Sequence, residues 1–150
     1  MGEIKLRRAG GKDIDEILKI EKSVDGTKIY SALTDRNDVM KCITDDVFYL
    51  IEKNNEIVGD VSYELKEKGS AYLSGLVIMP EFQGQGIARE VISVILEELK
   101  NVRMIELFTH PENKKSISLY TSLGFKETGE RLENYFGDGE PRIKMTLKNK

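Results

Sequence analysis

A chain of 150 residues has the length of one domain, and folding at this length buries roughly 68–70% of the surface that the unfolded chain exposes. Hydrophobic residues make up 39% of the sequence and charged residues 33%, which is typical of a soluble globular domain. The net charge of −3 argues against sequence-independent nucleic-acid binding, because such binding needs a basic face. One cysteine, Cys42, and one histidine, His110, exclude an intrachain disulfide and metal sites built from paired Cys or His ligands, so we expect no metal.

No apolar stretch approaches the roughly 18 residues of a membrane span, and the first residues lack the apolar core of a signal peptide. We therefore expect a cytoplasmic protein with neither membrane nor nucleic acid as a partner. Repeats and low-complexity linkers are missing from the sequence, which predicts a single domain over residues 1–150.

The first third of the chain predicts one strand and two helices. Residues 3–8 read as an edge strand, and Asp13 with Glu16 three residues later reads as the start of a helix. An acid-rich segment, 23–46, follows, and we expect a short helix within it at about 39–43.

From residue 47 the pattern changes to strands. Residues 47–51 form a buried run, Asn54-Asn55 predicts a turn, and residues 61–65 alternate between apolar and polar side chains. A further strand over residues 71–78 contains Gly75, which marks a bulge or a close backbone approach.

The second half alternates helices and strands. Apolar residues at helical spacing predict a helix over 87–100, a strand follows at 104–109, and a helix that carries Tyr120 ends at Gly124. Two closing strands are expected at 125–132 and 142–147. The order β-α-α-β-β-β-α-β-α-β-β predicts a mixed α/β fold, with helices flanking a sheet.

The segment over residues 76–88 carries the clearest chemical signal, because a strand enters a loop with Gly84 and Gly86 and then a long helix. Glycines allow close approach to a ligand, and the free N–H groups and dipole of the helix start favour a diphosphate. A tight turn without a ligand is the alternative. A Rossmann loop would need a third glycine where Arg89 stands, and the Gly-Lys-Ser/Thr of a Walker loop does not follow.

Two motifs resemble those of the GNAT superfamily, the acetyl-CoA-dependent N-acetyltransferases. Gln83-Gly84-Gln85-Gly86-Ile87-Ala88 is similar to its Gln/Arg-x-x-Gly-x-Gly/Ala signature, and Asn113-x-x-Ser116-x-x-Leu119-Tyr120-x-x-Leu123-Gly124-Phe125 is similar to its second signature. The resemblance extends over nearly the whole chain. It implies a mixed, mostly antiparallel sheet of six to seven strands with about four flanking helices, and an enzyme that uses acetyl-CoA.

The resemblance also implies cofactor contacts. Backbone N–H groups of residues 83–88 would hold the CoA pyrophosphate, and the backbone of Leu76, Val77 and Ile78 would pair with the pantetheine arm. Asn113 and Ser116 would contact the cofactor, although Asn113 alone reads equally well as a helix N-cap. Gly75 would mark the bulge that separates two strands around the arm.

For catalysis, the resemblance implies that Tyr120 protonates the leaving thiolate, and a backbone N–H of Val77 or Ile78 would polarise the acetyl carbonyl. The general base stays open. Ribosomal-protein N-terminal acetyltransferases carry a glutamate where Phe108 stands here, which leaves Glu106, His110 or a water relay as candidates.

The acceptor is expected to be a primary amine of a small molecule, such as a polyamine. The carboxylates of the acid-rich segment would attract a cation there, although a solvated acidic loop is the plainer interpretation; they are Asp25, Asp35, Asp38, Asp45 and Asp46. Tyr30, Tyr72 and Tyr135 are candidates to line the pocket.

Three alternatives stay open at this stage. The hairpin around Tyr135 is similar to one in N-terminal acetyltransferases, which makes a peptide amine the second acceptor class. Phe108 in place of the glutamate keeps open a non-catalytic acyl-CoA sensor. The strands at both ends leave a homodimer open as well.

Overall fold

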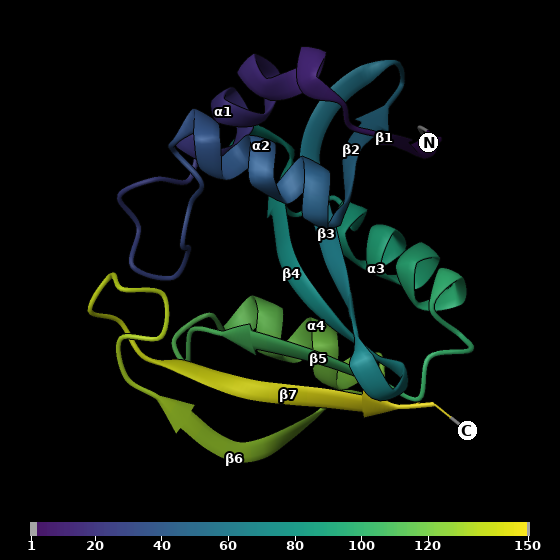
Figure 1. Cartoon of the computed structure of the whole chain (residues 1–150), viewed down its shortest axis with the longest axis vertical. Helices are drawn as coiled ribbons and strands as arrows, with labels where there is room; N and C mark the ends of the chain where they lie inside the picture. The colour runs from purple at the N-terminus through teal and green to yellow at the C-terminus, as the bar shows by residue number, and fades with distance from the viewer. Residues whose placement is uncertain (1–2, 150) are drawn as a thin grey trace.

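A mixed seven-stranded sheet runs through the computed structural model, which describes residues 3–149, in the order β1-β2-β3-β4-β5-β7-β6 (Figure 1). The strands are β1 (Ile4–Arg8), β2 (Val47–Lys53), β3 (Glu56–Lys66), β4 (Ser70–Ile78), β5 (Met104–Thr109), β6 (Lys126–Leu132) and β7 (Arg142–Lys148). The helices are α1 (Ile14–Lys22), α2 (Arg36–Asp45), α3 (Ile87–Glu98) and α4 (Lys114–Ser122). Only β4 and β5 pair in parallel.

The predicted order of helices and strands is confirmed, together with the mostly antiparallel sheet. The Asn54-Asn55 turn is also confirmed, since both residues have positive φ, 54° and 66°. Helix α2 is longer than predicted because the Asp35 carboxylate caps it, accepting from the N–H of Asn37 at 2.7 Å and of Asp38 at 3.2 Å.

Helix α1 begins directly after Asp13, as predicted, but the Asp13 side chain does not cap it. Residues Gly11–Asp13 form a 3₁₀ turn ahead of α1, and the Asp13 side chain makes no hydrogen bond to the first turn of that helix. Its carboxylate instead accepts from the N–H of Gly10 at 2.9 Å and from the guanidinium of Arg7 at 3.2 Å. The 3₁₀ turn directs this carboxylate back toward β1.

Each face of the sheet has its own apolar core. Helices α1 and α2 cover one face and α3 and α4 the other (Figure 1). The α1–α2 core includes Ile17, Ile20, Phe48 and Val77, and the α3–α4 core includes Ile92. Within residues 3–149, each helix is too short or too polar for a bilayer span.

The sheet opens between β4 and β5. Their parallel pairing involves only the first three residues of each strand, up to Tyr72 opposite Glu106. On the other side of β4 the register shifts, because Ser62 of β3 pairs with Gly75 and Tyr63 pairs with Leu73, which leaves an extra residue on β4. A bulge bends the strand that carries it, so β4 turns away from β5 directly after the paired segment. The bulge predicted at Gly75 is therefore confirmed.

Candidate active site

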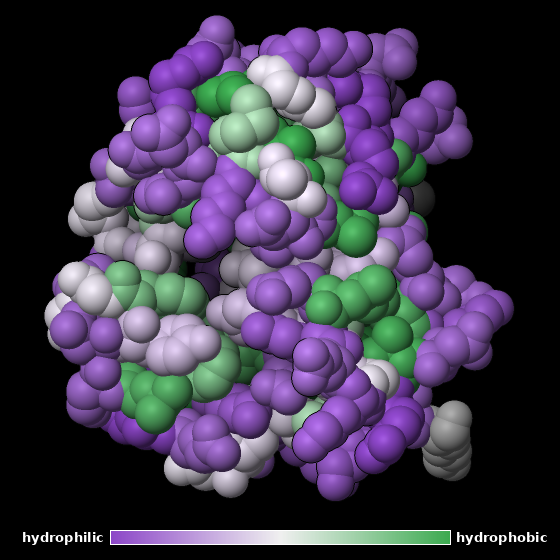
Figure 2. Space-filling view, in the orientation of Figure 1, coloured by the Kyte–Doolittle hydropathy of each residue, from purple (hydrophilic) through white to green (hydrophobic). Residues whose placement is uncertain are grey.

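A cavity of about 960 Å³ occupies the region where β4 and β5 separate. Its walls come from both halves of the chain: α1 and the segment after it, β3, β4, the loop before α3, and the start of α4. The surface is hollowed between the loop that follows α1 and the loop that joins β6 to β7 (Figure 2). An acceptor and an extended cofactor can therefore meet inside the fold.

One end of the cavity is the predicted anion site at the start of α3. Gly84 and Gly86 have φ of 80° and 79°, the left-handed region that glycine adopts without strain. The first intrahelical hydrogen bond runs from the N–H of Glu90 to the Gly86 carbonyl, so the N–H groups of Ile87 and Ala88 precede the helical ladder. These groups are free to donate to an anion at the positive end of the helix dipole.

Most of the predicted loop residues line the cavity, and one does not. Gly84, Gly86, Ile87 and Ala88 lie on its wall, whereas the Gln85 side chain turns away and accepts from Lys53 at 3.0 Å.

The loop residue Gln83 also lines the cavity, and its side chain orients the end of β4. The Gln83 side-chain amide donates to the Ile78 carbonyl at 2.8 Å. Met79, the residue after Ile78, donates its N–H to the Val58 carbonyl of β3 at 2.9 Å. Backbone groups of successive strand residues point to opposite sides. The N–H of Ile78 therefore points away from β3, on the side where β4 has no neighbouring strand, and that of Val77 points toward β3.

The start of α4 forms another part of the wall. Asn113 and Ser116 both line the cavity, and the Asn113 side chain accepts from the N–H of Ser116 at 3.2 Å. The N-cap alternative for Asn113 is thus observed. Lys114 and Lys115 lie beside them on the wall and bring positive charge to the side that faces the α3 anion site.

Tyr120 of α4 also lines the cavity. Its side chain is buried, and its ring packs edge to face against Phe125 with centroids 5.4 Å apart. Burial, and secondarily the neighbouring Tyr30, raise the pKa of the Tyr120 phenol above its usual value. The phenol therefore stays protonated at neutral pH and can act as a proton donor.

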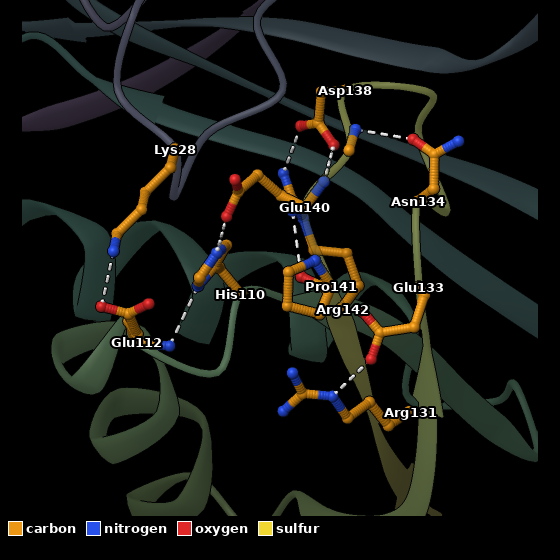
Figure 3. A network of polar contacts seen from close by, with 11 residues as sticks. Lys28, His110, Glu112, Arg131, Glu133, Asn134, Asp138, Glu140, Pro141 and Arg142 are labelled. Atoms are coloured by element: carbon orange, nitrogen blue, oxygen red, sulfur yellow. Dashed lines mark hydrogen bonds and ion pairs between the residues drawn. The ribbon is translucent and has the colours of Figure 1, made fainter.

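Neither predicted base lines the cavity. Glu106 lies outside the cavity lining and is held by Lys144 at 3.4 Å. His110 is 1% exposed, and both of its ring nitrogens have polar partners. Nε2 lies 2.8 Å from Glu140 and Nδ1 accepts from the N–H of Glu112 at 3.0 Å (Figure 3). His110 therefore fastens the β6–β7 loop to the end of β5.

The acceptor side of the cavity differs from the prediction. Tyr30 lines it, but Tyr72 and Tyr135 do not, because both pack against Phe108, with ring centroids 6.2 and 4.3 Å away. Phe108 itself and Phe136 of the β6–β7 loop supply the aromatic wall. The five carboxylates of the acid-rich segment are absent from the wall: Asp25, Asp35, Asp38, Asp45 and Asp46.

Two buried acidic residues on the wall were not predicted from the sequence. Glu21 of α1 and Asp60 of β3 are 4% and 2% exposed and contact each other. Burial, and then the charge of Glu21, raise the pKa of the Asp60 carboxyl well above its ordinary value. The signal that could have revealed Asp60 is a charged residue within an otherwise apolar stretch of a central strand, Val58 to Val61. Among residues 3–149, no cluster of His, Cys, Asp and Glu side chains has the arrangement of a metal site.

Comparison with known proteins places these features in a family. A model of the acetyltransferase (GNAT) family matches residues 13–125. The spermidine N(1)-acetyltransferase of Escherichia coli K12 is 31% identical over 77 residues, which are 48% of this chain and 41% of that protein. The chain thus matches about two-fifths of the length of this curated relative.

Two solved structures show the same fold along almost the whole chain. The ribosomal-protein-S18-alanine N-acetyltransferase of Escherichia coli superposes with a TM-score of 0.82 at 20% identity, covering 97% of this chain and 94% of that one. The PaiA N-acetyltransferase of Thermoplasma acidophilum, in complex with coenzyme A, gives 0.76 at 18% identity, covering 97% and 99%. At these identities the likeness concerns the fold.

Proposed function

Since the chain belongs to the acetyltransferase (GNAT) family, we propose that it transfers the acetyl group of acetyl-CoA directly to a primary amine of a small molecule, such as a polyamine. One observation carries this proposal: the anion site at the start of α3, the buried Tyr120 and the Glu21–Asp60 pair all line the same cavity. The spermidine acetyltransferase among the relatives points to the same acceptor class.

In this proposal the cofactor lies along the opening of the sheet. The N–H groups at the start of α3, at Ile87 and Ala88, hold the pyrophosphate, and Lys114 and Lys115 add positive charge nearby. The pantetheine arm follows the unpaired side of β4 from Leu76 to Ile78, where the separated strands leave backbone groups without a neighbouring strand.

The reaction follows from the groups at the centre of the cavity. The reacting ammonium group first loses one proton to water. The N–H of Ile78 donates to the thioester carbonyl and stabilises the oxyanion as the neutral amine nitrogen attacks the carbonyl carbon. A C–N bond forms and the C–S bond breaks. Tyr120 donates its phenolic proton to the leaving sulfur and regains one from the nitrogen, so the acetylated amine and the free thiol both leave neutral at these atoms.

A peptide N-terminus is the second acceptor class, and one observation favours it. Phe136, from the loop between β6 and β7, reaches the cavity wall together with Phe108, and such an aromatic wall suits the first side chain of a peptide.

Thiol release from acetyl-CoA over a panel of polyamines, aminoglycosides, amino acids and short peptides with free N-termini tests the proposal. We expect turnover with spermidine or a related polyamine. Turnover with peptides alone would favour the second class. No release with any acceptor, despite tight acetyl-CoA binding, would contradict the enzyme and favour the sensor.

A further inference from the structure

The Glu21–Asp60 pair is costly to bury. Two carboxyl groups in contact, each almost fully buried, lose the hydration that a charged group needs. The Asp60 Oδ2 atom accepts no hydrogen bond from an N–H or hydroxyl group of residues 3–149, and the polar partner of the carboxyl group is the Glu21 carboxyl group. A buried carboxyl oxygen normally accepts from such a donor, and one without it in a cavity wall marks a place where a ligand completes the bonding.

The position of the pair ties it to the proposed reacting centre. Asp60 pairs with Val77 across the β3–β4 ladder, and directly opposed residues project from the same face of a sheet. Val77 belongs to the core beneath α1 and α2, so the Asp60 side chain lies on that face, where Glu21 of α1 meets it. The pair therefore borders the β4 segment that is proposed to hold the thioester.

Glu21 is fixed in place, which leaves Asp60 as the free partner. One Glu21 oxygen, Oε1, accepts from the N–H of Leu33 at 2.9 Å and anchors the segment between α1 and α2. Among residues 3–149, no lysine or arginine forms an ion pair with either carboxyl group. The third carboxylate on the cavity wall, Glu112, is exposed and already paired with Lys28 at 2.8 Å.

We propose that Asp60, together with Glu21, forms a cation subsite that binds an ammonium group of the acceptor. This inference rests on the proposed function and narrows its substrate class to amines that enter as cations, such as a polyamine. An ammonium N–H in the cavity donates to the Asp60 carboxyl group, and its charge balances the negative charge of the pair. An uncharged acceptor supplies no positive charge to balance the two carboxyl groups.

The subsite also predicts that a bound cation displaces a proton from the Glu21–Asp60 pair. Glu21 faces Asp60 from α1, and the other titratable side chains on this side of the wall are Cys42 of α2 and Tyr30. Burial, and then the charge of Asp46, raise the pKa of Cys42 to about 11, and burial raises that of Tyr30 above its usual value. Neither titrates near neutral pH. A cation that enters therefore expels the proton shared by the two carboxyl groups, and binding weakens as the pH falls.

Calorimetric titration of spermidine into the CoA-bound full chain tests the subsite. We expect Asp60→Asn to weaken spermidine binding by about ten- to hundredfold, the range of one hydrogen bond to a charged group. Glu106→Gln is the matched control, because it removes a carboxylate outside the cavity, and it should change the affinity less than about twofold. Octane-1,8-diol, an uncharged probe, should not distinguish wild type from Asp60→Asn.

Two further measurements keep the test independent of folding and of turnover. The wild type alone, titrated in buffers of different ionisation enthalpy, should release protons when spermidine binds. The affinity for CoA and the melting temperature show that Asp60→Asn is folded.

The subsite is overturned if the wild type does not bind spermidine, binds it without proton release, or binds it as tightly after Asp60→Asn. Binding that depends on Asp60 without acetyl transfer would refute the proposed function and leave the subsite standing. Acetyl transfer to spermidine that is unaffected by Asp60→Asn would support the proposed function and refute the subsite.

Discussion

Gly59 of β3 is the position where one methyl group should disturb the site most. A Cβ atom built there lies 2.1 Å from the Val77 carbonyl oxygen and 3.2 Å from Cα of Ile78. Ordinary contact begins at 3.4 Å, so the oxygen distance is 1.3 Å too short, and the atom in the way belongs to the backbone. Gly59→Ala therefore forces β3 away from β4 at Val77 and Ile78, the segment proposed to hold the thioester.

The expected loss follows from that displacement. Overpacking costs about 1–3 kcal/mol, and each weakened ladder hydrogen bond adds about 1 kcal/mol, so we expect about 3 kcal/mol for Gly59→Ala. In a chain of 150 residues this lowers the melting temperature by roughly 6–12 °C. The acetyl-CoA affinity should also fall at temperatures where the variant is folded, because Val77 and Ile78 are displaced.

Gly10→Ala is the matched control. Gly10 has φ of −130°, and a Cβ atom there has no neighbour within 4 Å, so this variant should melt within about 2 °C of the wild type. Thermal denaturation followed by circular dichroism, with a titration of acetyl-CoA, measures both effects. If Gly59→Ala melted as the control does and bound acetyl-CoA normally, the close contact between β3 and β4 would be refuted.

Substitutions at three other residues separate the proposed roles. Tyr120→Phe should lower kcat by about 10²-fold or more and leave acetyl-CoA affinity unchanged; an unchanged kcat would exclude the phenol as the acid. Asn113→Asp should keep the α4 cap but weaken acetyl-CoA binding through charge repulsion, whereas Asn113→Ala should lower the free energy of unfolding by about 1 kcal/mol. Equal acetyl-CoA affinity in the wild type and Asn113→Asp would show that Asn113 only caps the helix. Because burial and Glu21 raise the pKa of Asp60, the folded protein holds this proton more tightly than the unfolded chain, and its stability falls as pH rises above about 4. Asp60→Asn should therefore melt higher than the wild type, by more at pH 8 than at pH 4.5, and an equal difference at both pH values would argue against the raised pKa.

Much of the fold could be predicted from the sequence because its signals are local. Apolar residues at Ile87, Val91, Ile92 and Ile95 repeat at helical spacing, and the structure buries all four. The glycine-rich loop before them could be placed at a helix start for the same reason. The helix start at Asp13 could also be predicted, but the Asp13 side chain does not cap the helix, because a 3₁₀ turn directs its carboxylate to Gly10 and Arg7.

The candidate site could be predicted only in part. Its cofactor side follows from contiguous motifs, whereas its acceptor side depends on strand register and on loops that meet in space. Glu21 and Asp60 come together only once α1 packs on β3, and no local pattern shows that contact. His110 is similar, since its partner Glu140 belongs to the β6–β7 loop. Both cases concern polar groups whose partners are far away in the sequence.

The central claim is direct acetyl transfer from acetyl-CoA to an amine, and the stoichiometry of products tests it most directly. The purified chain, incubated with acetyl-CoA and spermidine, should yield one acetylated amine, identified by mass spectrometry, for each free thiol. Tyr120→Phe should slow both products equally. Thiol release without acetylated amine, or tight acetyl-CoA binding with neither product from any amine tested, would contradict the account.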